Sequence, residues 1–222
     1  MNLLLTSVAA LSVAFVTSFS AHAQEVSGNA EAGAKKAEMC IGCHGIVGYK
    51  ATFPEVYRVP MISGQNAKYI EAALRAYQKG ERHNPTMRGI AASLTEQDMA
   101  DLAAFYAKNG APFPTAPEQP RVQPDAKVAE LLAKGACASC HGANLSKPID
   151  PSYPKIAGQP ADYLYVALKS YKDDTHATWG RSNAIMGGIA KQFELGELKA
   201  LAGYISKLDG ELKTQPEPRF RR

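Results

Sequence analysis

The segment Cys40-Ile41-Gly42-Cys43-His44 organises the sequence around it, and a second copy stands at Cys137-Ala138-Ser139-Cys140-His141. In each copy the two thiols lie three residues apart, about one helical turn, so both can face the same side of a helix. A histidine follows directly. This C-x-x-C-H spacing is typical of covalent haem attachment through two thioether bonds, with the histidine able to bind the iron from one side. The sequence therefore predicts two haem c groups.

Other uses of paired cysteines fit less well. A thioredoxin-like redox pair does not need a histidine after its second cysteine, and the chain lacks the βαβ pattern expected around such a pair. A zinc site would have to combine segments more than ninety residues apart, whereas structural zinc pairs lie closer in sequence. The two segments use all four cysteines, so none remains for a separate disulfide framework. The predicted attachment points are Cys40, Cys43, Cys137 and Cys140.

The amino terminus has the features of an export signal. Residues 3–19 form an apolar run, and Ala21 and Ala23 give the small-x-small pattern of a signal-peptidase site. We predict that residues 1–23 are a cleaved signal peptide and that the mature protein is periplasmic. No Lys or Arg precedes the run, which weakens the signal, and an uncleaved membrane anchor is the alternative.

The mature sequence consists of two similar halves. Each has a helix-forming stretch that leads into its C-x-x-C-H segment, a second helix after an Ile-x-Gly-Gln sequence, and a closing amphipathic helix. No β pattern is present, so the predicted fold class is all-α. The predicted domains are 24–111 and 125–214, joined by a Pro-rich linker at 112–124 and followed by a basic tail at 215–222.

The helix boundaries can be predicted from capping residues. Asp125 is expected to cap the helix before the second C-x-x-C-H segment, and Thr95 to cap the closing helix at 95–108. Both C-x-x-C-H segments are expected to end a helix. The apolar positions of the two closing helices match at a constant offset of 99 residues: Met99, Leu102, Phe105 and Tyr106 correspond to Leu198, Leu201, Tyr204 and Ile205.

Alignment of the halves selects one methionine in each as the second ligand of the iron. Met87 pairs with Met186, whereas Met39, Met61 and Met99 meet other residue types. Both selected methionines precede the closing helix, in segments that we predict to be loops. The predicted axial ligands are therefore His44 with Met87, and His141 with Met186.

Two further histidines are the alternatives to the methionines. His83 and His176 would give iron with two histidine ligands and a lower potential. They lie four and ten residues before their methionines, so they do not occupy matching positions in the repeat. Met61 and Met99 are expected to serve as packing residues.

The formal net charge is +4, and the whole excess lies in residues 121–222, with 15 Lys and Arg against 11 Asp and Glu. Three of these cations, Arg219, Arg221 and Arg222, belong to the predicted tail. Ionised haem propionates would offset the positive charge, so nucleic-acid binding has little support.

Taken together, these motifs resemble class I cytochrome c domains, and the tandem with its Ile-x-Gly-Gln repeats and proline linker resembles the dihaem cytochrome c4 family over nearly the whole mature chain. The resemblance implies two domains that face each other across a pseudo-twofold interface, with haem propionates close together, in a periplasmic electron carrier. The family's iron ligands correspond to His44, Met87, His141 and Met186. About five additional residues around 173–181 are a departure that could change the choice of partner.

Iron with two protein ligands has no open position for oxygen or substrate, so it can only change charge. We therefore expect an electron carrier rather than an enzyme, linking a quinol-oxidising cytochrome complex or a dehydrogenase to a terminal oxidase. The alternatives are the cytochrome subunit of a periplasmic dehydrogenase, such as a sulfide-oxidising flavocytochrome, and a peroxidase with one open haem. The sequence leaves open loose membrane association and the choice between monomer and weak dimer.

Overall fold

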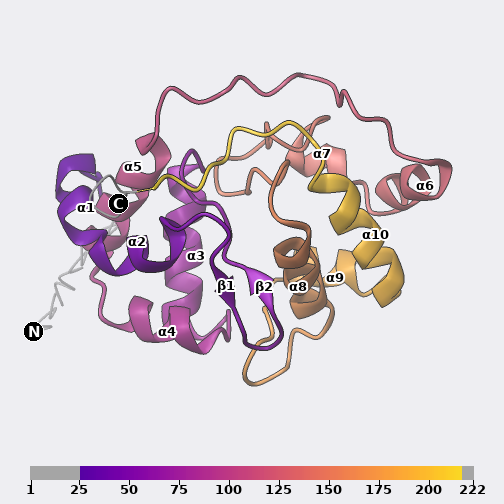
Figure 1. The fold of residues 1–222 in the computed structure, drawn as a ribbon. Coiled ribbons are helices and arrows are strands. Elements are labelled where there is room, and N and C mark those ends of the chain that lie inside the picture. The colour runs from indigo at the N-terminus through magenta and orange to yellow at the C-terminus, as the bar shows by residue number, and fades with distance from the viewer. Residues whose placement is uncertain (1–25, 217–222) are drawn as a thin grey trace, which may run out of the picture.

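The computed structural model describes residues 26–216, so the predicted signal peptide and the tail arginines lie outside the described residues. The described chain is mostly helical and divides into two similar halves (Figure 1). The N-terminal half contains α1 (Ala30–Lys36), α2 (Glu38–His44), α3 (Ala67–Lys79), α4 (Pro85–Ala92) and α5 (Glu96–Lys108). The C-terminal half repeats this order as α6 (Ala126–Lys134), α7 (Cys137–His141), α8 (Ala161–Lys172), α9 (Ala184–Ala190) and α10 (Leu195–Ile205).

The predicted all-α class is confirmed, with one small addition. Strands β1 (Lys50–Ala51) and β2 (Tyr57–Arg58) form an antiparallel hairpin in the N-terminal half. Each strand has two residues, which is too short for the alternating pattern by which a strand is recognised in a sequence. In the part of the chain that is described, no helix is long and apolar enough to cross a membrane.

The closing helices α5 and α10 form the centre of each half. Thr95 caps α5 in a capping box with Asp98, as predicted, because each side chain satisfies a backbone N–H that the first turn leaves unpaired. The apolar positions matched between the halves are buried in both helices, except Phe105, which is half-buried. Helices α1 and α3 pack on α5, and α6 and α8 pack on α10.

The two C-x-x-C-H segments differ in how they follow the preceding helix. The first ends α2, as predicted. The second forms its own short helix α7, because Ala136 takes a left-handed conformation with φ 46° and separates α7 from α6. Both segments therefore end a helix, as predicted, but the second ends a separate short helix.

Two extended segments connect the halves. The Pro-rich segment runs across one side of the molecule from α5 to α6, without helix or strand (Figure 1). After α10 the chain returns to the N-terminal half, where the Lys213 N–H donates to the Ser63 carbonyl at 3.0 Å and Lys213 Nζ donates to the Pro112 carbonyl at 2.9 Å. The carboxyl-terminal segment therefore ties the halves together.

Two glutamines join the halves in reciprocal fashion. The Gln65 side chain accepts from the Lys155 N–H at 3.0 Å and donates to the Lys155 carbonyl at 2.9 Å. The Gln159 side chain makes the same two contacts with Met61, at 3.0 and 2.6 Å. Such reciprocity is what an approximate twofold axis between similar units produces.

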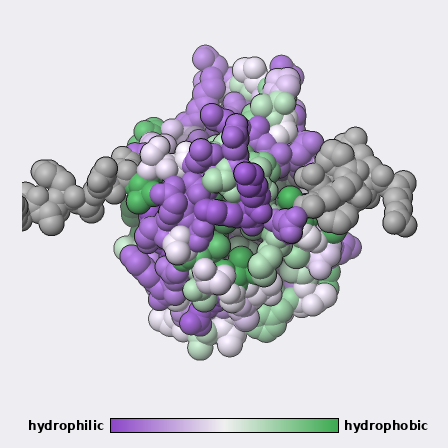
Figure 2. Space-filling model, turned by 90° about the vertical axis from the view of Figure 1, so that its left-hand side faces the viewer, coloured by the Kyte–Doolittle hydropathy of each residue, from purple (hydrophilic) through white to green (hydrophobic). Residues whose placement is uncertain are grey.

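The end of the molecule that carries α1 and α2 is mostly hydrophilic, with apolar residues gathered in a smaller area near its middle (Figure 2). Large apolar side chains next to the first C-x-x-C-H segment are exposed, among them Met39 and Val47, of which 67% and 71% is accessible to solvent. The segment therefore lies close to an apolar surface rather than deep inside the fold.

Candidate haem sites

A cavity of about 1010 Å³ lies between the halves, and its lining is mostly apolar. Its volume lies at the upper end of the roughly 300–1,000 Å³ of ordinary small-molecule pockets, and residues of both halves line it. The structure brings all eight predicted site residues to its wall: Cys40, Cys43, His44, Met87, Cys137, Cys140, His141 and Met186.

The cysteines of each pair lie one turn apart in α2 and α7, and all four are free of disulfide bonds. Burial raises the pKa of the Cys40 and Cys137 thiols. Since the thiols remain unpaired and each pair faces the cavity, their arrangement fits covalent attachment to one edge of a large apolar ligand.

The two histidines are oriented in the same way. His44 Nδ1 donates to the Pro60 carbonyl and His141 Nδ1 donates to the Pro154 carbonyl, both at 2.9 Å. A carbonyl can only accept, so Nε2 of each ring is left as the unprotonated nitrogen. Burial lowers the pKa of both imidazoles, which favours the neutral form that a metal requires. A metal-ligating histidine is commonly fixed by such a contact at its other nitrogen.

The two methionines lie in short helices, not in the predicted loops. Met87 is in the first turn of α4 and its N–H donates to Asn84 Oδ1 at 3.0 Å, whereas Met186 occupies the same place in α9, with its N–H 2.9 Å from Asn183 Oδ1. The loop prediction was wrong because Asn84 and Asn183 each cap and so start a short helix. An Asn followed by Pro85 is a typical helix start, with the proline at the first helical position.

The alternative histidines do not reach the large cavity. His83 Nδ1 contacts the His176 carbonyl at 2.6 Å, and the His176 ring stacks on Trp179 with ring centroids 4.3 Å apart. The geometry therefore favours the methionines over these histidines.

The zinc alternative is not supported either. A structural zinc site needs four ligands, and residues 26–216 bring together no group of three His, Cys, Asp or Glu side chains that could hold a metal.

Several residues of the site were missed by sequence reasoning. The carbonyls of Pro60 and Pro154 carry no side-chain signal, although the two prolines do recur at matching positions. Arg82 and Arg181 also line the cavity.

The residues present fit two flat, apolar groups with an iron at the centre: paired free thiols, a neutral imidazole and a thioether in each half, around an apolar cavity.

Comparison with known proteins agrees with this geometry. The family model of cytochrome c matches residues 30–108 and 126–209, one region in each half. The chain is 30% identical over 187 residues to cytochrome c4 of Pseudomonas aeruginosa, a match covering 82% of this chain and 90% of that protein. It is also 30% identical over 186 residues to the thiosulfate dehydrogenase electron acceptor of Stutzerimonas stutzeri, covering 80% and 83%.

A solved structure has the same architecture. The cytochrome c4 of Acidithiobacillus ferrooxidans superimposes with a TM-score of 0.58 at 26% identity, covering 78% of this chain and 99% of that one. The family model matches each half separately, so the chain has two cytochrome c domains and two covalently bound haem c groups. The protein described here is a member of the cytochrome c4 family, the dihaem electron-transfer proteins built from two tandem cytochrome c domains.

Proposed function

We propose that this protein is a periplasmic electron carrier in which Cys40 and Cys43 bind one haem and Cys137 and Cys140 bind the other. Its axial iron ligands are His44 with Met87, and His141 with Met186. Each bound haem supplies a one-electron couple between ferric and ferrous iron. The predicted domains, 24–111 and 125–214, each hold one haem, and the 1–23 segment directs export.

The main support is the repetition of one arrangement around the cavity. In each half an imidazole is oriented by a proline carbonyl, and a methionine is held at the start of a capped helix. Two separate sites with the same four residue types at matching positions are hard to explain by packing alone. Thioether and imidazole together close both axial positions, which leaves electron transfer as the chemistry available.

The proposed role is to carry electrons from a respiratory donor, a quinol-oxidising cytochrome complex or a dehydrogenase, to a terminal oxidase. The alternative is a cytochrome subunit of a periplasmic dehydrogenase complex. The similarity to thiosulfate dehydrogenase electron acceptors favours a dehydrogenase of an inorganic sulfur compound as the donor in that case. Purification from native periplasm and membranes distinguishes the two, because a subunit copurifies with its catalytic partner and a free carrier does not.

The ligand assignment is tested with the variants Met87→Ala and Met186→Ala of the holoprotein. Each should remove the absorption band of thioether-bound iron from one haem and lower the midpoint potential of that haem, because methionine ligation favours ferrous iron. Met61→Ala is the matched control, since Met61 also lines the cavity but has no methionine counterpart in the repeat. The assignment is wrong if the band survives in both ligand variants.

Carbon monoxide binding tests whether protein ligands occupy both axial positions of each haem iron. The reduced wild-type protein should bind carbon monoxide slowly or not at all at neutral pH, because both axial positions are taken. Rapid stoichiometric binding would contradict the proposed carrier and favour an enzyme with an open haem. Mass spectrometry of the mature protein should show two added haem groups, and their absence would contradict the proposal entirely.

A further inference from the structure

Arg82 and Arg181 face each other across the boundary between the halves. Their backbones pair in an antiparallel bridge. On either side, the His83 N–H donates to the Gly180 carbonyl at 2.9 Å and the Ser182 N–H donates to the Glu81 carbonyl at 2.7 Å. Like charges directly opposite one another destabilise such a pair. The positive charges of the two arginines therefore repel each other at the boundary, and some other group must offset this repulsion.

The surroundings of the two arginines follow the approximate twofold relation of the halves. Each guanidinium lies over two tyrosine rings of its own half, 5.4–5.6 Å from the ring centroids. These rings hold the arginines in place but carry no net negative charge. The contacts are Arg82 with Tyr69 and Tyr77, and Arg181 with Tyr163 and Tyr171.

In the part of the chain that the structure describes, no carboxylate balances the two cations. Among residues 26–216, neither guanidinium forms an ion pair with Asp or Glu, although surface arginines such as Arg58 and Arg75 do. Arg181 is only 8% exposed. Burial would raise the pKa of the nearby Tyr171, but the guanidinium groups of Arg82 and Arg181 outweigh it and lower that pKa. The local field is therefore strongly positive.

Both arginines line the large cavity that holds the predicted haem ligands. Of the charged side chains in its described lining, Glu81 is the only carboxylate, against Arg82, Arg181 and three lysines. Two of the lysines have other partners, since Lys155 bonds Glu211 and Lys134 bonds the Gln192 carbonyl. The third lysine, Lys50, is exposed to solvent, so the arginines are the cations left for a group bound inside the cavity.

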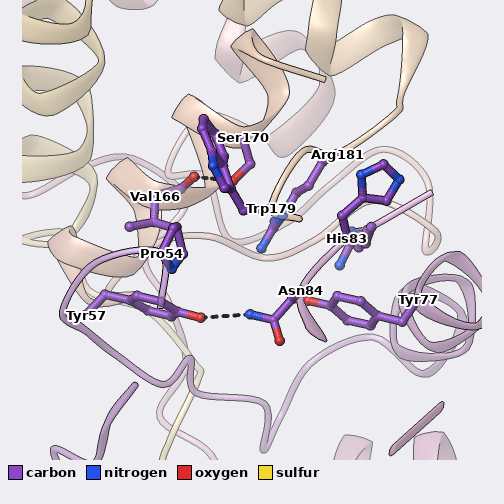
Figure 3. Close-up of a pocket in the computed structure, with 10 residues that line it drawn as sticks. Pro54, Tyr57, Tyr77, His83, Asn84, Val166, Ser170, Trp179 and Arg181 are labelled. Atoms are coloured by element: carbon purple, nitrogen blue, oxygen red, sulfur yellow. Dashed lines mark hydrogen bonds between the residues drawn. The ribbon is translucent and has the colours of Figure 1, made fainter. Parts of the chain in front are cut away.

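A smaller pocket of about 20 Å³ lies beside the large cavity and is lined by both arginines. Figure 3 shows Arg181 pointing inward from the C-terminal half, toward Asn84 and Tyr57 of the N-terminal half. The Asn84 side chain donates to the Tyr57 hydroxyl at 3.2 Å. The boundary is therefore polar around the arginines while the rest of the cavity wall is mostly apolar, so an anionic group of a large apolar ligand would be directed to this place.

We propose that Arg82 and Arg181 form one shared anion site, which binds propionate carboxylates of both haem groups. This inference rests on the proposed function. A guanidinium matches a carboxylate with two parallel hydrogen bonds, and two carboxylates offset the repulsion between the two cations. The site also binds the halves to each other through their cofactors, and it favours ferrous iron because it neutralises negative charge near each haem.

The test uses the holoprotein variants Arg82→Gln and Arg181→Gln. The haem spectrum of each variant is recorded in solutions poised at the midpoint potential of each wild-type haem in turn. The ratio of ferrous to ferric haem should fall roughly 10-fold for at least one haem in each variant. Arg82→Lys and Arg181→Lys keep the charge and should retain most of the ferrous fraction. Arg121→Gln is the control, because it removes the same charge from a side chain that is 75% exposed, and it should change nothing.

An unchanged ratio of ferrous to ferric haem in both Gln variants would overturn the inference. An equal fall of this ratio in the Gln and Lys variants would also overturn it, because charge would then not be the cause. The band of thioether-bound iron must persist throughout, so a failure here is distinct from a failure of the proposed ligands. If one Gln variant does not accumulate as holoprotein, the other Gln variant and the Lys variants decide by the same criterion.

Discussion

Asn84 and Asn183 have the same role in the two halves. Each caps the short helix that carries the proposed methionine ligand, and each accepts a hydrogen bond from the methionine N–H. A helix of seven or eight residues is marginal on its own, so the cap matters more here than in a long helix. The position of each thioether therefore depends on a residue three positions earlier.

Replacing Asn84 by Ala should lower the free energy of unfolding by about 1 kcal/mol, because the Met87 N–H loses its partner. Denaturation of the reduced holoprotein, followed at the band of thioether-bound iron, measures this. Asn84→Asp keeps an acceptor and should stay near wild type. Tyr57→Phe is the control for the second contact of Asn84. Equal losses in the Ala and Asp variants would show that capping is not the cause.

Lys36 lies between two carboxylates of α5, with Nζ 2.7 Å from both Asp98 Oδ1 and Asp101 Oδ2. Its hydrogen bond lowers the pKa of Asp98 to about 2 and also lowers the pKa of Asp101. Both fall below the ordinary value of 3.8. The stability they contribute is therefore present above about pH 4 and is lost as the pH falls toward 2.

The variant Lys36→Met should thus be less stable than wild type at pH 7, and the difference should shrink at pH 3. Urea unfolding of both proteins at the two pH values measures the change. Lys35→Met is the matched control, since Lys35 is exposed and should show the same small effect at both. A difference for Lys36→Met that does not depend on pH would contradict the ion-pair explanation.

At the scale of elements, α1 crosses α5 at a glycine. A Cβ on Gly33 would lie 2.0 Å from the Asp101 carbonyl oxygen and 2.8 Å from Phe105 Cβ. The two backbones can approach this closely only because Gly33 has no side chain. This contact fixes the packing of α1 on α5, and α1 leads directly into α2 with its haem-attachment segment.

Gly33→Ala should therefore lower the free energy of unfolding by about 1–3 kcal/mol, the range for overpacking a close contact, although Ala is the better helix former. Gly203→Ala in α10 is the matched control. Nothing lies within 4 Å of a Cβ there, so that change should raise stability by about 0.5–1 kcal/mol. Chemical denaturation of both variants checks the prediction, and effects of the same sign would refute the packing argument.

At the scale of the whole molecule, the additional residues of the second half lie at the boundary. About five additional residues around 173–181 are a departure from the family that could change the choice of partner. In the structure, this segment contacts the N-terminal half, through the Gly180 and His176 carbonyls that accept from His83. These contacts, the reciprocal glutamines and the two arginines form one continuous boundary between the halves.

Gln159→Ala should speed hydrogen exchange of the Met61 amide roughly 5-fold or more, because that N–H loses its acceptor at a cost of about 1 kcal/mol. The Lys155 amide, which depends on Gln65 instead, should stay protected. Gln65→Ala should give the reverse pattern. Exchange measured residue by residue on the holoprotein decides this, and an unaffected Met61 amide in Gln159→Ala would contradict the proposed contact.

The local chemistry of the chain could be predicted from its sequence. Cofactor attachment depends on a spacing of three residues, and the caps at Thr95 and Asp125 depend on side chains next to the helix they start. The repeat selected Met87 and Met186, which the structure places on the wall of one cavity. Such features are determined by neighbours in the chain, so the sequence contains them directly.

Only the tertiary structure decided the rest. The carbonyls that orient His44 and His141 lie 16 and 13 residues away in sequence. The boundary joins residues much farther apart, such as Gln65 and Lys155, which are separated by 90 residues. Arg82 and Arg181 look like ordinary surface cations in a sequence. They become a close pair, with Arg181 buried and Arg82 half-buried, because folding brings the two halves face to face, and no local pattern encodes that approach.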